Sequence, residues 1–366
     1  MAMPMAEAWW KRALRLAGAL AWAVGAGLGL LLLVEGSVRL LWPRVNVQST
    51  SRDLFQVARY GPSHGLRPGA SGDSFGVRVT IDEDGFRRSA AARPVHPQAT
   101  VLFLGDSVTF GVGVAAAETF VGRLQAARPD LRIINAAAPL YNLADYRNLL
   151  FHLPLSSWGV GQVYLFYTVN DVMGPAGLVA HAPRKGTWAK ARDLATWCHR
   201  ALASRSKLYV LLKSLRYRDI SLAYFSYDLG QYGPGSPRLR KTLSLLEEVR
   251  VLAGERGLAL HVVLLPCEPQ LREAPPADAS KPQRLVGSFL AGKQMEYLDL
   301  AEAFRRAGRP SRQLFLYADY MHLSPAGHAI VFQAVLEDLP GRVDRAGAGA
   351  GQLPGAPVAV RRGSPK

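Results

Sequence analysis

The chain has 366 residues, of which 49% are hydrophobic, and it carries a formal net charge of +16. This apolar content excludes general disorder, and the length allows one large domain or two small ones. The basic residues are scattered along the chain and form no known nucleic-acid-binding motif. We therefore expect no nucleic-acid partner, and an anionic lipid surface or an acidic polysaccharide suits the charge better.

The N-terminal part predicts a membrane anchor. A short basic segment, residues 1–15, precedes an uncharged run at residues 16–34, which spans roughly 28 Å as a helix. We expect residues 16–41 to form a transmembrane and juxtamembrane helix. A cleaved signal peptide and a buried core helix are the alternatives, but the run exceeds a usual signal and no small-residue cleavage site follows it. Positive charges weakly favour a cytoplasmic N-terminus and an extracytoplasmic domain.

Residues 42–98 form a connecting region rich in Arg, Gly and Ser. Within it, residues 77–81 alternate like a half-buried strand, and Asp84-Gly85 predicts a turn into Phe86 and Arg87. We expect a small β-hairpin that packs on the following domain as a cover.

From residue 99 to residue 339 the pattern alternates between strands and helices. Apolar runs predict strands at 101–104, 131–135, 163–167, 258–265 and 295–298, with helices at 118–128 and 145–153 among the segments between them. Strands separated by helices favour parallel pairing with right-handed crossovers. The sequence therefore predicts a three-layer α/β/α sandwich with a mainly parallel five-stranded sheet.

Two segments depart from that alternation. An insertion at about 174–236 contains a helical stretch at 206–217 that mixes leucines with basic residues. This stretch is either an ordinary solvated helix or a lid or membrane-surface helix beside the catalytic edge. Residues 340–366 have no apolar periodicity and are predicted to be disordered.

The first strand of this domain ends in Gly105-Asp106-Ser107. Ligands and chemistry gather at the carboxyl ends of parallel strands, so Ser107 is a candidate nucleophile; the alternative is that it only caps the next helix. The same tripeptide occurs at Gly72-Asp73-Ser74, but no apolar strand precedes that copy. We expect the second copy to lie in a loop.

An acid and a histidine lie near the far end of the chain. Asp319 and His322 precede Ser324 and Pro325, which are typical of the N-cap and first residue of a helix. The two residues are thus expected on a loop, where the imidazole can serve as base and the carboxylate can hold its tautomer.

With these segments considered together, the chain resembles the SGNH/GDSL hydrolase superfamily. Gly105-Asp106-Ser107 matches its first block, Asn170-Asp171 after an apolar strand matches its third, and Asp319 with His322 matches its last, in the family's order. The resemblance implies a flavodoxin-like SGNH fold, a catalytic triad of Ser107, Asp319 and His322, and no metal or cofactor. It assigns the oxyanion hole to the backbone N–H of Ser107, a backbone N–H of the second block and the Asn170 amide. The alternative for Asn170 is a strand-ending residue that bonds local backbone.

The second block departs from the family pattern. By spacing, Leu140 stands where the family usually has glycine, and Val108 replaces the usual leucine after the serine. A backbone N–H survives at Leu140, but its side chain is expected to crowd the acyl pocket or shift the loop. The other histidines have no motif around them, and His261 is expected within the fourth strand.

The cysteine content gives little support for cross-linking or metal binding. Cys198 and Cys267 are the two cysteines, which excludes a disulfide framework and a Cys-x-x-Cys metal site. The sequence leaves open whether the two cysteines form one disulfide or remain as two buried thiols.

We therefore expect a serine esterase, anchored in the membrane, that acts on an O-acylated envelope carbohydrate or lipid. An O-acyltransferase with the same triad is one alternative. A catalytically silent glycan-binding or scaffolding domain is another, and the changed second block is its support. The sequence names no protein partner.

Overall fold

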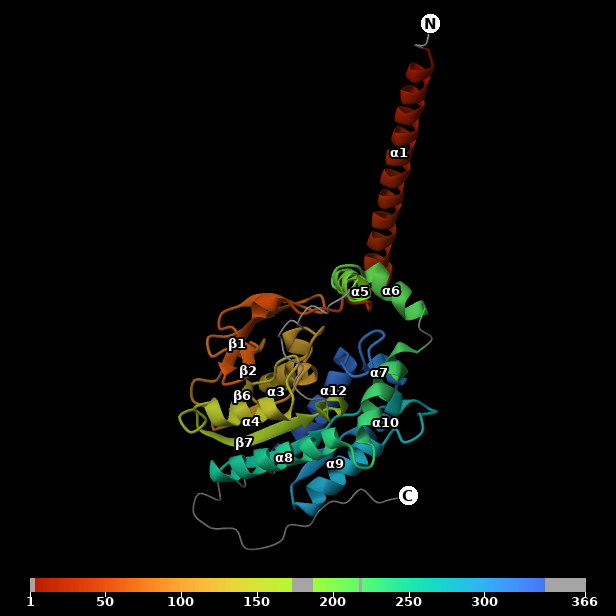
Figure 1. The fold of residues 1–366 in the computed structure, drawn as a ribbon. Helices are drawn as coiled ribbons and strands as arrows, with labels where there is room; N and C mark the ends of the chain where they lie inside the picture. The colour runs from red at the N-terminus through yellow and green to blue at the C-terminus, as the bar shows by residue number, and fades with distance from the viewer. Residues whose placement is uncertain (1–3, 173–186, 217–218, 340–366) are drawn as a thin grey trace.

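The computed structural model describes residues 4–172, 187–216 and 219–339. Its centre is a five-stranded parallel sheet with the strand order β6-β5-β7-β8-β9 (Figure 1). Residues 101–104 of β5 have no exposed area, because helices cover both faces of the sheet, which explains their uninterrupted apolar run. The strands are β5 (Ala99–Leu104), β6 (Leu131–Asn135), β7 (Val160–Tyr167), β8 (Ala259–Leu264) and β9 (Tyr297–Asp299).

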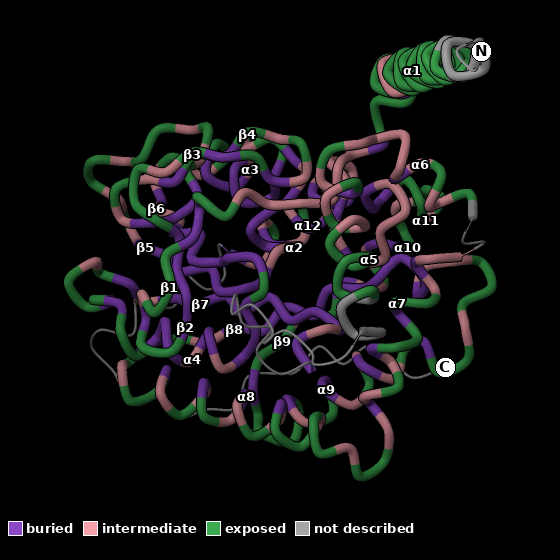
Figure 2. Tube along the Cα trace, turned by 45° about the horizontal axis from the view of Figure 1, so that its top comes forward, coloured by how far each residue is buried: buried purple, intermediate pink, exposed green. Residues whose placement is uncertain are grey.

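Helices form a layer on each side of this sheet (Figure 2). On one side α3 (Phe120–Ala127) packs against α12 (Pro325–Asp338), and on the other α4 (Leu143–His152) packs against α8 (Pro237–Glu255). Helix α9 (Lys281–Gly292) lies beside β9 in the second layer. The predicted three-layer α/β/α sandwich is therefore confirmed.

The strand order reverses direction next to β5. From β5 the chain continues to β6, which pairs with one edge of β5. It then crosses to β7, which pairs with the other edge of β5, and the later strands follow on that side. Such a switch point opens a crevice at the carboxyl ends of the strands, where ligands bind in open α/β sheets. Ser107 follows β5 and Asn170 follows β7, so both lie at this edge.

Local capping moves two helix starts away from the predicted positions. The predicted helix at 118–128 is a short 3₁₀ turn (Ala116–Glu118) followed by α3, because the Thr119 side chain accepts a hydrogen bond from Gly122 N and caps α3. Helix α4 starts at Leu143, earlier than predicted, because Asn142 and Asp145 form a capping box. The strand at 131–135 has the predicted bounds, and the ends of the other four differ from the prediction by up to three residues.

The region before β5 contains two antiparallel hairpins that pack on the sandwich. They are β1 (Phe55–Tyr60) with β2 (Ser63–Leu66), and β3 (Ser71–Ser74) with β4 (Val77–Thr80). Leu54 and Ile81, in the segments flanking β1 and β4, are wholly buried in the core.

The expectation that Gly72-Asp73-Ser74 is a loop is wrong. These residues belong to β3, and β4 pairs with this preceding strand; a single bridge joins Ile81 to Arg87 across the predicted Asp84-Gly85 turn. The hairpin turn is made by Phe75 and Gly76, which have φ values of +49° and +79°. Two consecutive positive φ values are typical of a type I′ turn, and a phenylalanine there gave no sequence signal.

Helix α1 (Pro4–Leu41) projects away from the sandwich, and residues Arg12–Leu41 are long and apolar enough to cross a membrane (Figure 1). Two helices of the insertion, α5 (Thr187–Ala203) and α6 (Lys207–Arg216), lie at its foot. A third, α7 (Ile220–Leu229), docks on the sandwich and buries Phe225 completely. Residues 174–186 of the insertion and the tail predicted at 340–366 lie outside the described residues.

Short elements complete the description. They are α2 (Ser107–Phe110), α10 (Ala301–Arg306), α11 (Ser311–Leu314) and the 3₁₀ turns η1 (Arg52–Leu54), η3 (Val169–Val172), η4 (Gly230–Tyr232) and η5 (Glu268–Leu271).

Candidate active site

Ser107 is the first residue of α2, directly after the end of β5. The cap of this helix is Asp106, whose Oδ1 accepts a hydrogen bond from Val108 N at 2.8 Å. The reading of Ser107 as the helix cap is therefore wrong, and its hydroxyl is available for another partner. Gly105 makes the tight turn possible, because a Cβ there would lie 2.1 Å from Thr109 Oγ1.

Arg87 holds the loop that follows α2. Its guanidinium donates to the carbonyl oxygens of Phe110, Gly111 and Val114, each at 2.5 Å. Burial lowers the pKa of Arg87 to about 10, so the side chain remains charged at neutral pH. This buried contact connects the N-terminal cover to the segment that positions Ser107.

Asp319 and His322 lie on a loop closed by a bridge between Phe315 and Leu323. The Asp319 carboxylate organises this loop: Oδ1 accepts from the backbone N–H groups of Met321 and His322 at 3.0 Å each. Its Oδ2 lies 2.6 Å from His322 Nδ1. The predicted Ser324 cap of α12 is confirmed by its hydrogen bond from Gly327 N.

These segments meet at the carboxyl edge of the sheet. Ser107 Oγ lies 2.8 Å from His322 Nε2, and the imidazole reaches Asp319 through its other nitrogen. The side chains of His322 and Asp319 are 14% and 10% exposed. The structure thus brings Ser107, His322 and Asp319 into one hydrogen-bonded chain with the arrangement of nucleophile, base and orienting acid.

The electrostatics of this chain favour a basic imidazole. Burial alone would lower the pKa of His322, but the charge and hydrogen bond of Asp319, with a further contribution from Asp106, raise the pKa above its ordinary value of 6.5. Burial acts to raise the pKa of Asp319, yet His322 and the two backbone N–H donors lower it overall. Asp319 therefore stays ionised at neutral pH and strengthens His322 as a proton acceptor.

Asn170 lies in η3 after β7, in a polar network beneath Ser107. Its Oδ1 accepts from Thr168 Oγ1 at 2.5 Å, and its side chain also hydrogen-bonds the Asp106 carboxylate. An amide NH₂ group has two hydrogens, so one remains for a ligand. Burial raises the pKa of Asp106, and hydrogen bonds from Val108, Thr168 and Asn170 oppose this shift. Sequence reasoning missed Thr168, which joins Asn170 to Asp106.

Leu140 occupies a tight turn in which Tyr141 N bonds to Ala138 O at 3.3 Å. Its φ is +73°, in the left-handed region that favours glycine, and its side chain is 46% exposed. The backbone therefore adopts a glycine-like conformation although the residue is leucine. His64 of β2 braces the turn: its Nε2 lies 3.0 Å from Pro139 O, and its carbonyl accepts from the Tyr141 hydroxyl at 2.7 Å. No sequence signal linked His64 to this turn.

Other contacts join the His322 loop to distant segments. The Tyr317 hydroxyl lies 2.6 Å from Ser214 Oγ of α6, and the Tyr320 hydroxyl donates to Asp228 Oδ2 of α7 at 2.6 Å. The ring of Phe75 lies 5.3 Å from that of His322. The insertion and the cover thus both touch the loop that carries the candidate base.

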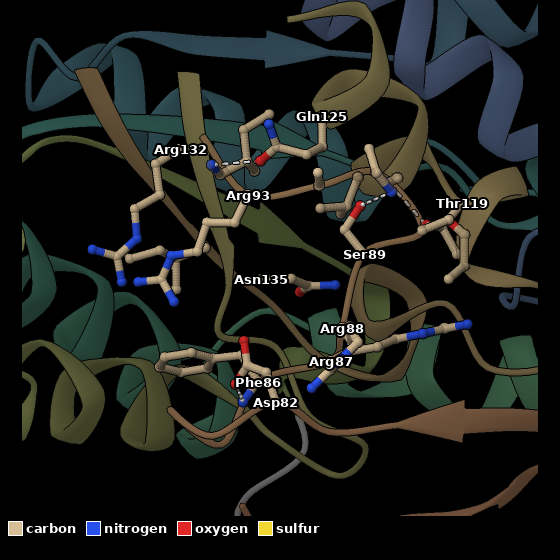
Figure 3. A pocket seen from close by; sticks show the side chains of 18 of the residues that line it. Asp82, Phe86, Arg87, Arg88, Ser89, Arg93, Thr119, Gln125, Arg132 and Asn135 are labelled. Carbon is tan, nitrogen blue, oxygen red and sulfur yellow. Dashed lines mark hydrogen bonds between the residues drawn. The ribbon is translucent and has the colours of Figure 1, made fainter. Parts of the chain in front are cut away.

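A separate cavity of about 500 Å³ lies between residues 82–93, α3 and the edge strand β6 (Figure 3). Arginines and acids line it together, and Asp84 pairs with Arg93 at 2.7 Å and with Arg132 at 3.4 Å. Ser107, Asp319 and His322 are not among its lining residues. This cavity is therefore distinct from the candidate active site, and ion pairs neutralise part of its charge.

Two further histidines and the two cysteines lie outside the candidate site. His328 is buried in α12, where Nδ1 accepts from Phe120 N at 3.2 Å and burial lowers its pKa to about 3. His261 lies in β8 as predicted. Cys198 and Cys267 are free thiols, and Cys267 is buried. Across the described ranges, no group of three or more His, Cys, Asp or Glu residues is placed to hold a metal ion.

Fold and site together define a three-layer α/β/α protein with a hydrogen-bonded serine, histidine and aspartate at the carboxyl edge of its sheet. No protein-family model matches the chain, and no curated protein matches it. Solved structures similar to it include lipolytic G-D-S-L family proteins and acetylxylan esterases. The five-stranded parallel sheet with helices on both faces agrees with the three-layer fold that the sequence predicts.

Three of these structures show the degree of similarity. A member of the lipolytic G-D-S-L family from Veillonella parvula DSM 2008 is 12% identical, with 67% of this chain and 99% of that chain covered and a TM-score of 0.39. An acetylxylan esterase from Geobacillus stearothermophilus is 16% identical, with 67% and 96% covered and a TM-score of 0.40. The acetyl xylan esterase AlAXEase is 14% identical, with 66% and 99% covered and a TM-score of 0.42.

Proposed function

We propose that this chain is a membrane-anchored serine esterase of the SGNH type that hydrolyses O-acyl esters through an acyl-enzyme on Ser107. The observation that carries the proposal is the hydrogen-bonded chain from Ser107 through His322 to Asp319 at the carboxyl edge of the sheet. The motif resemblance of the sequence supports the same reaction class.

The proposed reaction has two acyl-transfer steps. Ser107 Oγ attacks the ester carbonyl carbon while His322 Nε2 takes the hydroxyl proton; this proton then passes to the alcohol oxygen as its bond to carbon breaks. The alcohol leaves and the acyl group stays on Ser107. A water molecule, deprotonated by His322, attacks the acyl carbon, and the carboxylic acid leaves as Ser107 regains its proton. Asp319 holds the imidazole tautomer throughout.

Three donors are proposed for the oxyanion that forms in each step. They are the backbone N–H of Ser107 at the start of α2, the backbone N–H of Leu140 and the remaining amide hydrogen of Asn170. The turn at Leu140 keeps a left-handed φ despite its side chain, which supports a role for this backbone rather than for a glycine as such. The exposed leucine side chain is proposed to limit the acyl group to a short chain.

The proposed substrate is an O-acylated carbohydrate or lipid of the cell envelope. Helix α1 supports this choice, because an apolar stretch at Arg12–Leu41 would hold the domain close to such molecules. We place the domain outside the cytoplasm. A reporter that is active only after export, fused after Leu339, should be active, with the protein in the membrane fraction; full-length protein in the soluble cytosolic fraction would contradict this placement.

The function is tested by acyl release from a panel of aryl esters and acetylated glycans, by the wild type and by Ser107→Ala. Hydrolysis by the wild type and its loss in the variant are expected. Acyl transfer to an added sugar acceptor in preference to water would identify an O-acyltransferase. Glycan binding by both proteins without acyl release from any ester would favour the silent-domain alternative and overturn the proposal.

A further inference from the structure

The end of α1 is fixed to the start of α6 by a charged contact. The Glu35 carboxylate accepts from Lys207 N at 3.0 Å, Leu208 N at 2.9 Å and Ser206 Oγ at 2.8 Å. Arg39 of α1 also donates to Arg205 O at 2.6 Å. A carboxylate on the first N–H groups of a helix is a stabilising arrangement, so α6 takes its position from α1.

Helix α5 is attached to α6 through its polar side. His199 Nδ1 lies 2.7 Å from the Tyr209 hydroxyl of α6, and Ala203 O accepts from Gln48 N at 2.8 Å at the end of the helix. At about 100° per residue, Thr196 shares the polar side with His199 and Arg200 lies at its flank, while three apolar residues lie on the opposite side. These apolar residues are Leu194, Trp197 and Ala201.

This apolar side of α5 has no protein cover within the described part of the chain. Leu194 is 61% exposed and Trp197 is 65% exposed, and Leu212 on α6 is 54% exposed. Exposed apolar residues gathered on one side of a helix are typical of a site that contacts protein or membrane. Leu40 and Trp42 at the end of α1 are also exposed apolar residues, with 82% and 47% of their surface accessible.

The position of α5 relative to α1 indicates what covers it. In Figure 1, α5 is seen end-on at the foot of α1, so its axis runs across that of α1. A helix that crosses the foot of a membrane-spanning helix lies parallel to the bilayer surface. Exposed Arg200, Arg205 and Arg44 beside it suit lipid phosphates, and a tryptophan suits the headgroup boundary.

We propose that α5 is an interfacial helix that lies in the surface of the bilayer spanned by α1, with Leu194 and Trp197 at the boundary with the acyl chains. This inference rests on the proposed anchor and does not depend on the proposed chemistry. Since α6 also contacts Tyr317, two residues before Asp319, the surface would hold the candidate active site at a set height and orientation above the bilayer.

The test uses the full-length chain in phosphatidylcholine–phosphatidylglycerol vesicles, with a spin label at one cysteine in a Cys198→Ser background. Leu194→Cys reports the apolar side of α5, Thr196→Cys is the matched control on its opposite side, and Leu28→Cys reports α1. Collisions with oxygen, which partitions into lipid, are compared with collisions with a water-soluble nickel complex. The label at 194 should lie about 5–10 Å below the phosphates, and the label at 196 should remain in water.

Two results would overturn the inference. A lipid-embedded label at position 28 with aqueous labels at both 194 and 196 would leave the anchor intact and remove the interfacial helix. A label at 194 that is shielded from both reagents would mean that protein, not lipid, covers α5. Acyl release measured on the same vesicles separates either result from a failure of the proposed function.

Discussion

The two loops proposed to serve Ser107 differ in how they are held. The loop of residues 315–323 is organised from within, because the Asp319 carboxylate bonds two backbone N–H groups and the His322 ring. The turn around Leu140 is braced from outside, by His64 of the cover. Both contain a non-glycine residue with positive φ, Ala318 at +52° and Leu140 at +73°.

The two loops therefore differ in which of their side chains can be substituted without loss of the proposed function. In the His322 loop the side chains that perform the proposed chemistry also hold the backbone, so a change there affects both. In the Leu140 turn only a backbone N–H is proposed to contact the oxyanion, and residues outside the turn hold its backbone in place. The side chain at position 140 is therefore free to differ from the family's glycine.

The largest expected effect comes from the residues of the internally organised loop and its partner. Ser107→Ala and His322→Ala should each lower kcat by about 10⁵–10⁶, and the double variant should be little worse, because the residues act as one unit. Single-turnover and steady-state assays on an acetate ester measure this.

The control for that experiment is the second Gly-Asp-Ser copy. Ser74 is buried in β3, and its hydroxyl lies 2.9 Å from Thr50 Oγ1, whereas it is the Ser107 hydroxyl that contacts His322. Ser74→Ala should keep its turnover. Loss of activity in this variant with an unaffected Ser107→Ala would show that the wrong serine has been chosen.

Asp319→Asn should lower kcat less than the loss of His322 does, and it should also shift the pH dependence of kcat/KM. We expect kcat to fall by about 10⁴, because the wrong tautomer of His322 is favoured. In the wild type, kcat/KM should fall on acidification through a pKa above 6.5, since Asp319 raises the pKa of His322 and only the neutral ring accepts a proton. The variant loses this raising interaction, so its acid limb should lie at lower pH. An unshifted limb would separate Asp319 from the titrating group.

Asn170→Ala tests a donor that belongs to neither loop. Loss of one oxyanion-hole donor typically lowers kcat by about 10²–10³, while KM changes little because the bond forms mainly in the transition state. Thr168→Val is the matched control, since it removes the hydroxyl that contacts Asn170 and Asp106 but no proposed donor. Equal losses in kcat for the two variants would mean that the network, and not the Asn170 donor, is what matters.

The smallest expected effect is the stability gained by a glycine at either left-handed position. A leucine in the left-handed region destabilises the folded state by about 1–2 kcal/mol. Glycine removes this strain, but its more flexible unfolded chain lowers the stability by about 0.4–1 kcal/mol. Leu140→Gly should therefore raise the free energy of unfolding by up to about 1.6 kcal/mol, as measured by urea denaturation. Ala318→Gly should have the same sign.

Leu140→Ala separates the side chain from the backbone in this comparison. If the leucine only narrows the acyl pocket, Leu140→Ala and Leu140→Gly should both accept longer acyl esters and keep their activity on acetate. Gains on every ester in Leu140→Gly alone would mean that the native turn is mis-set, which favours the silent-domain alternative.

The local chemistry of the chain was sufficient to predict the sandwich and the three segments that meet at its edge. Uninterrupted apolar runs such as 101–104 mark strands that are buried on both faces, and the Ser324-Pro325 pair marks the start of α12. These signals depend on neighbouring residues alone, so no tertiary information is needed to interpret them. The resemblance then related Ser107, Asn170, Asp319 and His322 to one another.

Only the tertiary structure decided what holds these residues and what surrounds them. The contact of His64 with the Leu140 turn joins residues 75 positions apart, and that of Ser214 with Tyr317 joins residues 103 apart. The carboxylate of Glu35 on the first turn of α6 spans 172 positions. Hydrogen bonds of this kind leave no periodic pattern in the sequence, because they depend on how separate elements pack. The strand at Gly72-Asp73-Ser74 was missed for the same reason, since its partner and its turn, and not its own propensity, make it a strand.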